Sequence, residues 1–374
     1  MRLKTRLLLL LAKHHKGNTK NSFCDLNIEK LPRFDRILVL STTAIGDTLL
    51  STPVLTALHE EYPDATIKFL VRDKFSTLFV NNSEIDGIIL YHKSYLGLLK
   101  TYRQIKNGDF QLALVLHISD PRPAVLAKLA GIPCIIGNSP GKNFNHLFTK
   151  TAKHKPGVIH GIDYRMDVIK TILPRRRKWP YRMILPLNND KTRLIFEEFC
   201  QKMHINPVEQ IVIGFQPGAS EKFRMWPRDN FIALGKALLE LNKQIKILIL
   251  GSLNEKKLAK TIEEGIGQKE SVFFHFIPLS DLPHIVSRLQ CLVTNDTGTM
   301  HIAVAVQTPT VALFVPTDPL GIGPVQDMKI HRVVAKPSPC GNDCKGKRCP
   351  ENIECMSLIS VKEVLEAVSS VLKL

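Results

Sequence analysis

Three loops of this 374-residue sequence carry side chains whose types and spacing could do chemistry. The stretch "VLSTTAIGDTLLSTPV" places a carboxylate, Asp47, just after an apolar run. "QPGASEKFRMWP" offers Ser220 and the cations Lys222 and Arg224, and "NDTGTMHIAVAV" offers a helix start at Thr297. A carboxylate can take a proton from a hydroxyl, whereas cations and free helix N–H groups bind phosphate. The second and third loops therefore predict a phosphate cradle, whereas a lone carboxylate in a loop, such as Asp47, is more often structural than catalytic.

The cradle has a further set of candidate residues. Glycine at 218 and 298 lets an anion approach the backbone closely, and Asp296 and His301 flank the second turn. Each residue alone has an ordinary structural interpretation, since an aspartate often caps a helix and a buried histidine is more often a hydrogen-bonded core residue. Their combination in this order is more specific.

Several enzyme classes are unsupported because their motifs do not occur in the sequence. It contains neither G-x-x-x-x-G-K-[ST] nor G-x-G-x-x-G after a strand, which argues against P-loop NTPases and dinucleotide dehydrogenases. It also contains no D-x-D, the acidic pair with which some sugar transferases hold a metal-bound nucleotide diphosphate. No metal is therefore expected in the phosphate cradle.

Short apolar runs alternating with helical stretches must position these loops. Such alternation is typical of parallel sheets covered on both faces. The expected strands are 36–41, 66–71, 87–92, 111–117 and 134–138, then 210–218, 246–252, 271–276, 291–296 and 310–316. The loops that carry Asp47, Gly218 and Asp296 each follow a strand, where open α/β sheets bind ligands. The fold class is thus α/β, with two Rossmann-like domains.

A basic, proline-bearing stretch at 173–190 separates the two halves and is interpreted as a linker. With 374 residues, 44% of them hydrophobic, the chain is long enough for two globular domains. We expect a basic N-terminal segment at 1–35, a first α/β domain at 36–185, a second α/β domain at 186–356 and a terminal helix at 357–374.

The net charge of +17 is enough to draw the protein towards polyanions, and the alternative is a basic surface that serves only solubility. Nucleic acid is disfavoured because no nucleic-acid motif accompanies the charge. The basic, leucine-rich start "MRLKTRLLLLLAKHHK" is too short to span a bilayer, which needs about 20 apolar residues. A segment lying on an anionic membrane surface and a frayed helix both fit it. A signal peptide fits less well, since basic residues stand where the cleavage site belongs.

From about residue 36 to residue 370 the sequence resembles the glycosyltransferase family 9 heptosyltransferases, which build the inner core of bacterial lipopolysaccharide on a GT-B fold. The resemblance is carried by "STTAIGDTLLSTPVLTAL", "FQPGASEKFRMWP", "LSDLPHIVSRLQCLVTNDTGTMHIAVAVQTPTVALF", "PTDP" and "CGNDCKGKRCPENIECM". It implies an acceptor-binding domain at 36–185 and a nucleotide-sugar-binding domain at 186–356, facing each other across a cleft. It also implies an inverting enzyme that needs no cofactor and uses ADP-heptose as donor.

The resemblance also implies roles for individual residues. Asp47 would be the catalytic base that deprotonates the attacking sugar hydroxyl, and closure of the domains would assemble the site. Family members usually have lysine where this sequence has arginine at 224, so phosphate contact is expected there and proton donation is not. The donor-binding residues would be Gly218, Ser220, Arg224, Glu255, Asp296, Thr297, Gly298 and His301.

The acceptor would be the lipid A–Kdo part of lipopolysaccharide, at the inner face of the cytoplasmic membrane. Candidate contacts to its acidic groups are Arg122, Lys128, Lys142 and Arg165, although each could instead be a solvated cation. The alternatives are a family 9 enzyme that moves another sugar and a non-catalytic nucleotide- or glycan-binding protein. A monomer is expected.

Four cysteines gather late in the chain, at positions 340, 344, 349 and 355. Their spacing is not the paired C-x-x-C of a zinc ribbon. The family often carries such a cluster without needing a metal for transfer. A thiol-rich loop is therefore the favoured interpretation of Cys340, Cys344, Cys349 and Cys355, and a structural zinc site is the alternative.

Overall fold

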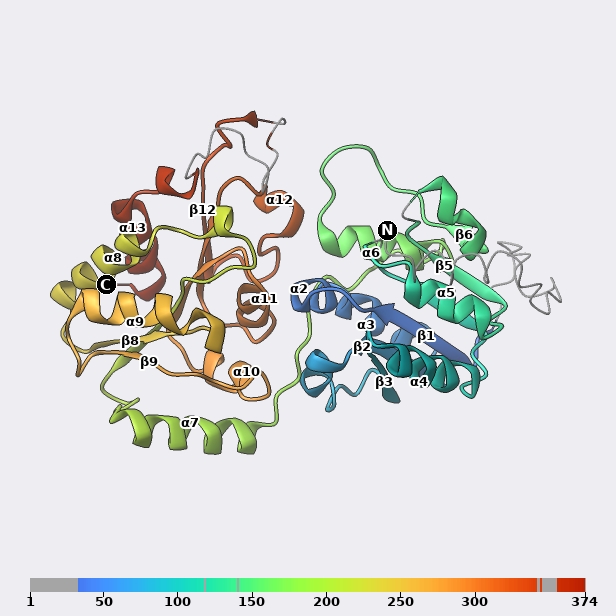
Figure 1. Ribbon diagram of the computed structural model, residues 1–374, viewed down its shortest axis with the longest axis horizontal. Coiled ribbons are helices and arrows are strands. Elements are labelled where there is room, and N and C mark those ends of the chain that lie inside the picture. Colours follow the sequence, from blue (N-terminus) through green and yellow to red (C-terminus); the bar gives the residue numbers. More distant parts are fainter. Residues whose placement is uncertain (1–32, 118, 140, 342–343, 345–354, 374) are drawn as a thin grey trace. The chain divides into compact units, whose positions relative to one another are not determined.

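The computed structural model describes residues 33–117, 119–139, 141–341, 344 and 355–373 (Figure 1). The chain divides into two compact units, Met1–Ile184 and Leu185–Leu374, and the boundary lies inside the basic stretch at 173–190. The N-terminal segment expected on a membrane surface lies outside the described residues. Within the described part, no helix is both long and apolar enough to cross a bilayer.

The first unit is built on a six-stranded sheet in which every neighbouring pair of strands is parallel. Its order is β3-β2-β1-β4-β5-β6. The central strands are buried along almost their whole length, as expected for a sheet covered on both faces. The strands are β1 (Arg36–Ser41), β2 (Thr66–Arg72), β3 (Gly87–Tyr91), β4 (Leu112–Val115), β5 (Cys134–Gly137) and β6 (Lys150–Thr151).

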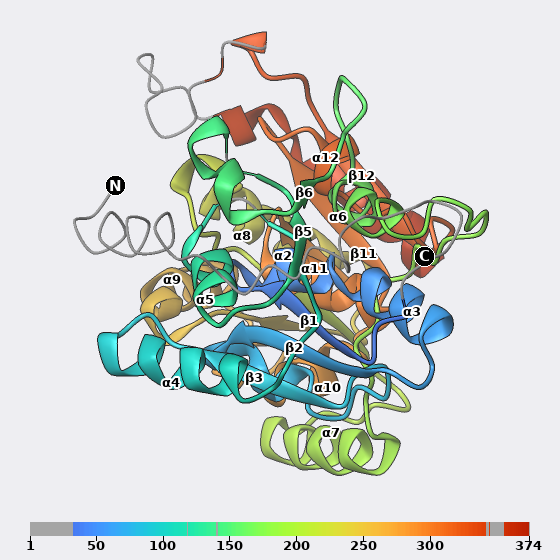
Figure 2. The same cartoon turned by 90° about the vertical axis from the view of Figure 1, so that its right-hand side faces the viewer.

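Helices cover both faces of the first sheet (Figures 1 and 2). On one face, α4 (Tyr95–Lys106) and α5 (Arg122–Leu129) pack against alternate strand residues such as Leu38 and Leu40. On the other face lie α3 (Thr52–Glu61) and α6 (Gly161–Lys170), which contact each other. The short elements are α2 (Ile45–Leu49), η2 (Asp73–Leu78) and η3 (Lys142–Leu147).

The second unit repeats this plan with a six-stranded parallel sheet of order β12-β11-β10-β7-β8-β9. When the strands of this unit are numbered from one and the sheet is read from β9 to β12, the order is 3-2-1-4-5-6, the same as in the first unit. Both sheets thus have the doubly wound topology of dinucleotide-binding folds. The strands are β7 (Ile211–Gln216), β8 (Ile245–Ile249), β9 (Val272–Phe274), β10 (Cys291–Asn295), β11 (Thr310–Phe314) and β12 (His331–Ala335).

Three helices share one hydrophobic core on one face of the second sheet: α8 (Arg228–Leu241), α9 (Lys256–Ile266) and α13 (Val361–Leu372). Trp226 is 1% exposed in this core and donates from its indole N–H to the carbonyl of Ile359, 2.9 Å away. On the other face, Met300 of α11 (Gly298–Ala305) packs on β11. The remaining elements are α7 (Asn189–Met203), α10 (Leu282–Val286), α12 (Pro319–Ile322), η4 (Lys222–Arg224), η5 (Leu253–Glu255) and η8 (Cys355–Leu358).

The predicted α/β class is confirmed, and each expected strand is present with small differences at its ends. Two strands at sheet edges were not expected. Strand β6 has only two residues, and β12 begins with His331 and Arg332, so neither gives a continuous apolar run. Edge strands are half covered and therefore show a weaker hydrophobic signal than central ones.

Doubly wound sheets bind ligands where the strand order reverses, beyond the carboxyl ends of two adjacent strands. In the first unit this position lies between β1 and β4, and in the second between β7 and β10. Asp47 follows β1, and the loops from Gly218 and from Asp296 follow β7 and β10. The topology therefore brings the sequence-predicted residues of each unit to its own switch point.

Candidate active site

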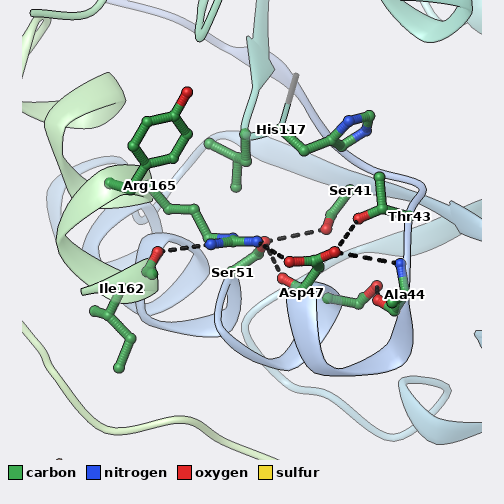
Figure 3. Close-up of polar contacts among 12 residues, drawn as sticks. Ser41, Thr43, Ala44, Asp47, Ser51, His117, Ile162 and Arg165 are labelled. Atoms are coloured by element: carbon green, nitrogen blue, oxygen red, sulfur yellow. Dashed lines mark hydrogen bonds and ion pairs between the residues drawn. The ribbon is translucent and has the colours of Figure 1, made fainter. Parts of the chain in front are cut away.

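Asp47 lies in the first turn of α2, the short helix that follows β1 (Figure 3). One carboxylate oxygen accepts from the hydroxyl of Thr43 at 2.9 Å and from the backbone N–H of Ala44 at 3.5 Å. The other oxygen accepts from the guanidinium of Arg165 at 2.7 Å. The Asp47 side chain remains 41% exposed, so a ligand can still reach the carboxylate.

These contacts decide the charge of Asp47. Burial alone would raise the pKa of this carboxyl, but the charge of Arg165 and the hydrogen bonds from Thr43, Ala44 and Arg165 outweigh it. The pKa of Asp47 is therefore lower than that of an ordinary aspartate. An ionised carboxylate at a ligand-binding edge can accept a proton from a bound hydroxyl.

Sequence reasoning placed Arg165 among the acceptor contacts, but in the structure this residue is 5% exposed and faces Asp47. Its guanidinium also donates to the hydroxyl of Ser51 and to the carbonyl of Gly161 (Figure 3). Of the other three candidates, the side chain of Lys142 lies outside the described part of the structure, and Arg122 and Lys128 also have internal partners. Arg122 binds the carboxylate of Asp120 through two nitrogens, and the Lys128 amine contacts the carbonyl of His146.

His117 was not singled out from the sequence, although it follows β4 at the switch point of the first sheet. Its Nε2 lies 3.0 Å from the hydroxyl of Thr42, in the loop that follows β1. Burial lowers the pKa of His117 to about 4, with the nearby Arg165 contributing, so the ring is neutral at physiological pH. A histidine directly after a central strand was the signal that could have identified it.

In the second unit, Gly218 of the loop after β7 lies against Glu255 of η5, which follows β8. A β carbon at position 218 would stand 1.6 Å from a Glu255 carboxylate oxygen, so any larger residue there would require the Glu255 side chain to move. The other oxygen of Glu255 accepts from the N–H and the hydroxyl of Ser252, both at 2.7 Å. Two predicted donor-binding residues are thus brought together.

Arg224 and Asp296 form an ion pair of 3.0 Å between the loops after β7 and β10. The Asp296 side chain is 6% exposed and that of Arg224 is 31% exposed. The Arg224 cation therefore neutralises the buried carboxylate of Asp296. The Nε of Arg224 is buried and has no hydrogen-bond partner among the described residues.

Helix α11 starts at the carboxyl end of β10, with Thr297 as its N-cap. The Thr297 hydroxyl accepts from the N–H of Met300 at 3.5 Å, which leaves the N–H of Gly298 outside this capping interaction. His301, one turn into α11, is 5% exposed. The first turn of a helix attracts anions through its free N–H groups and its dipole. The predicted phosphate-binding residues therefore gather at one edge.

The side chain of Asn295 holds this arrangement together and was also missed in the sequence. It is fully buried at the end of β10. Its amide nitrogen donates to the carbonyl of Pro217 at 2.8 Å, and its oxygen accepts from the N–H of Trp226 at 3.0 Å. One side chain therefore ties down both ends of the loop that contains Ser220 and Arg224.

A family model described as glycosyltransferase family 9 (heptosyltransferase) matches residues 98–352. The chain belongs to this family. Lipooligosaccharide heptosyltransferase 2 of Haemophilus influenzae (strain ATCC 51907 / DSM 11121 / KW20 / Rd) is 24% identical over 305 residues, covering 78% of this chain and 86% of the relative. The predicted resemblance and the enzyme class, a glycosyltransferase, are therefore confirmed.

Two solved family structures have the same fold. The family 9 glycosyltransferase of Veillonella parvula DSM 2008 superposes with a TM-score of 0.81 at 24% identity, over 91% of this chain and 97% of that one. The ADP-heptose lipopolysaccharide heptosyltransferase II of E. coli gives 0.74 at 21% identity, over 90% and 98%. The expected GT-B type of α/β fold is thus confirmed.

The late cysteines are only partly described. Cys340 and Cys344 are partly exposed and Cys355 is buried, whereas Cys349 lies outside the described residues. In the part of the chain that the structure describes, no group of three or more histidine, cysteine, aspartate or glutamate side chains could hold a metal ion. The thiol-rich loop and the zinc site therefore both stay predictions.

Proposed function

We propose that this glycosyltransferase moves heptose from ADP-heptose to the lipid A–Kdo inner core of lipopolysaccharide, with inversion and without a metal. The proposal rests on the side chains found at the switch points of the two sheets. One presents a reachable, ionised carboxylate at Asp47, and the other presents Arg224 and the start of α11. The first suits an acceptor hydroxyl, and the second suits a diphosphate.

In the proposed reaction, Asp47 takes the proton of the acceptor hydroxyl while its oxygen attacks the anomeric carbon. The bond between that carbon and the diphosphate oxygen breaks, and ADP leaves with the electron pair. Attack from the face opposite the leaving group inverts the anomeric centre. The charge that develops on ADP would be met by Arg224, whose buried Nε lacks a protein partner among the described residues, and by the N–H groups of α11.

The remaining donor contacts follow from their placement in the second unit. Glu255 has one carboxylate oxygen fixed by Ser252 and the other against Gly218, and we assign it to the nucleoside. Ser220 and Thr297 lie in the loops on either side of the Arg224–Asp296 pair, and we assign their polar groups to the phosphates. Cations and helix N–H groups would do the work that a chelated metal does elsewhere.

The acceptor carries acidic groups, and the +17 charge of the chain favours its approach and that of an anionic bilayer. We place the enzyme at the inner face of the cytoplasmic membrane, with the leucine-rich basic start of the chain on the lipid surface. Flotation with anionic vesicles tests this placement. Binding that is equal for neutral and anionic vesicles would argue against it.

The experiment that tests the function incubates the purified enzyme with a panel of nucleotide sugars and truncated core acceptors, followed by mass spectrometry. We expect transfer from ADP-heptose to lipid A–Kdo acceptors, with activity retained in EDTA at unchanged melting temperature. Transfer only from another nucleotide sugar would assign a different donor. ADP binding without any transfer would indicate a non-catalytic protein.

The base is tested by Asp47→Asn, which keeps the shape of the side chain but cannot accept the proton. We expect turnover to fall at least about a hundredfold, with ADP affinity unchanged. Asp64→Asn is the matched control, because that carboxylate lies in the same unit and is 82% exposed. Turnover by folded Asp47→Asn close to that of the control would place the base elsewhere.

A further inference from the structure

The guanidinium of Arg165 is held by three separate parts of the first unit. One terminal nitrogen donates to Asp47 at 2.7 Å, Nε donates to the hydroxyl of Ser51 at 3.1 Å, and the other terminal nitrogen donates to the carbonyl of Gly161 at 2.7 Å. These partners belong to α2, to the N-cap of α3 and to the start of α6. With all three nitrogens engaged, the guanidinium plane cannot rotate without breaking hydrogen bonds.

The charged guanidinium of Arg165 is also buried. The Arg165 side chain is 6% exposed, and a buried charge is tolerated only when it is paired and hydrogen-bonded. Among the described residues, its ion pair is the one with Asp47. The Asp47 side chain is 41% exposed, so the pair points from the protein interior toward the ligand-binding edge (Figure 3).

We propose that Arg165 is a positioning residue, which fixes the carboxylate of Asp47 in one orientation and keeps it charged for proton transfer. The inference rests on the proposed role of Asp47 as the base. It replaces the expectation that Arg165 contacts the acceptor. A side chain that is 5% exposed and has a partner on each of its three nitrogens has little left to offer a ligand.

The groups that face Asp47 allow the pH effect to be derived. Arg165 approaches from α6, and neutral His117 approaches from the end of β4 with Asp120 beyond it. Burial opposes ionisation of Asp47, and Arg165 is the largest influence that favours it. Removing the arginine therefore raises the pKa of Asp47. The acidic limb of kcat/KM, where the base is being deprotonated, should move to higher pH.

The test compares Arg165→Met, Arg165→Lys and the wild type, with kcat, both KM values and the pH profile measured for each. For Arg165→Met we expect kcat to fall about a hundredfold, the cost of a misplaced catalytic group. KM for the acceptor should stay within about twofold, because uniform substrate binding is not affected. Arg165→Lys should recover part of kcat and of the pH profile, since it keeps the charge but not the three directed bonds.

Arg176→Met is the matched control. Arg176 is also a partly buried arginine of the first unit, and it contacts the carboxylate of Glu60 and the carbonyl of Ala57 in α3. Its loss should lower the melting temperature without moving the acidic limb. If Arg165→Met does not fold, Ser51→Ala removes the partner of Nε, together with the hydrogen bonds of the Ser51 hydroxyl to Ser41 and to the carbonyl of Asp47. It keeps the Arg165 charge and should move the acidic limb in the same direction by less.

Three results would overturn the inference. A raised acceptor KM with unchanged kcat and pH profile would make Arg165 a binding residue. A lowered melting temperature with an unmoved limb, in Arg165→Lys and Ser51→Ala alike, would make its role structural only. Near-normal turnover in Asp47→Asn would show that Asp47 is not the base. If Asp47→Asn is inactive but the acidic limb of the pH profile does not move in the Arg165 variants, only the positioning role is refuted.

Discussion

Asn295→Ala removes a side chain that fastens both ends of the loop after β7, which we propose to bind phosphate. The change leaves two buried backbone groups, the N–H of Trp226 and the carbonyl of Pro217, without their partner. Each such group costs roughly 1–3 kcal/mol, so the second unit should lose about 2–6 kcal/mol of unfolding free energy. For a domain of 150–250 residues, each kcal/mol lowers Tm by about 2–4 °C.

The same substitution should weaken ADP binding. The loop between Pro217 and Trp226 carries Ser220 and Arg224. Without the hydrogen bonds of Asn295, ADP would have to order this loop when it binds. We expect Kd for ADP to rise at least about tenfold, which corresponds to about 1.4 kcal/mol. Thermal unfolding followed by circular dichroism and calorimetric titration with ADP measure the two effects.

Asn242→Ala is the control, because Asn242 also accepts a backbone hydrogen bond in the second unit, from Gln244 at 2.8 Å, but at an exposed position. Its cost should stay within about 0.5 kcal/mol. The reasoning is refuted if Asn295→Ala melts within about 1 °C of this control and binds ADP equally well. A large loss of Tm with unchanged ADP affinity would mean that Asn295 stabilises the second unit but does not influence ADP binding.

Three further predictions concern the second unit. Gly218→Ala would force its methyl group against Glu255 and displace that carboxylate, so ADP affinity should fall about tenfold in calorimetry while Tm changes little. Burial lowers the pKa of His331 to about 4, so wild-type stability should fall on the order of 2 kcal/mol between about pH 7 and pH 5 as the unfolded state gains a proton. In His331→Gln this loss of stability on acidification should be smaller by that amount, as denaturant titration at both pH values would reveal. Trp226→Phe leaves the carbonyl of Ile359 unpaired and should cost about 2–4 kcal/mol in the same assay.

Each of these predictions has a contrary result. Normal ADP affinity in Gly218→Ala would separate Glu255 from the nucleotide. An equal loss of stability on acidification in wild type and His331→Gln would assign the acid sensitivity to other groups, such as His117, whose pKa is also about 4. A Trp226→Phe variant as stable as the wild type would mean that the indole hydrogen bond is dispensable.

The sequence predicted the sheets because their central strands are short apolar runs that bury both faces, as in "RILVLS" and "CLVTND". It also predicted that Asp47, Gly218 and Asp296 each lie in a loop that follows such a strand, as they do in the structure. Doubly wound sheets place the carboxyl ends of adjacent strands at one edge, so the position of a residue after a strand is informative by itself.

Pairing between distant residues could not be predicted in this way. Arg165 and Asp47 are 118 residues apart, and nothing in either local sequence indicates that they touch. For the same reason Arg224 was expected to be free for phosphate, whereas it shares its charge with Asp296. Local patterns fix periodicity and turns, but ion pairs between elements depend on how the sheet and its helices pack.

The hydrogen bond from Trp226 to Ile359 has a consequence for how the protein is made. Trp226 ends the loop that follows β7, and the core around it is completed by Val364 and Val368 of α13. This segment follows the rest of the second unit in the chain, so during translation the second unit stays without part of its core until the segment has been synthesised. A ribosome that stops before Ile359 would therefore release a chain with exposed apolar surface, which chaperones and proteases recognise.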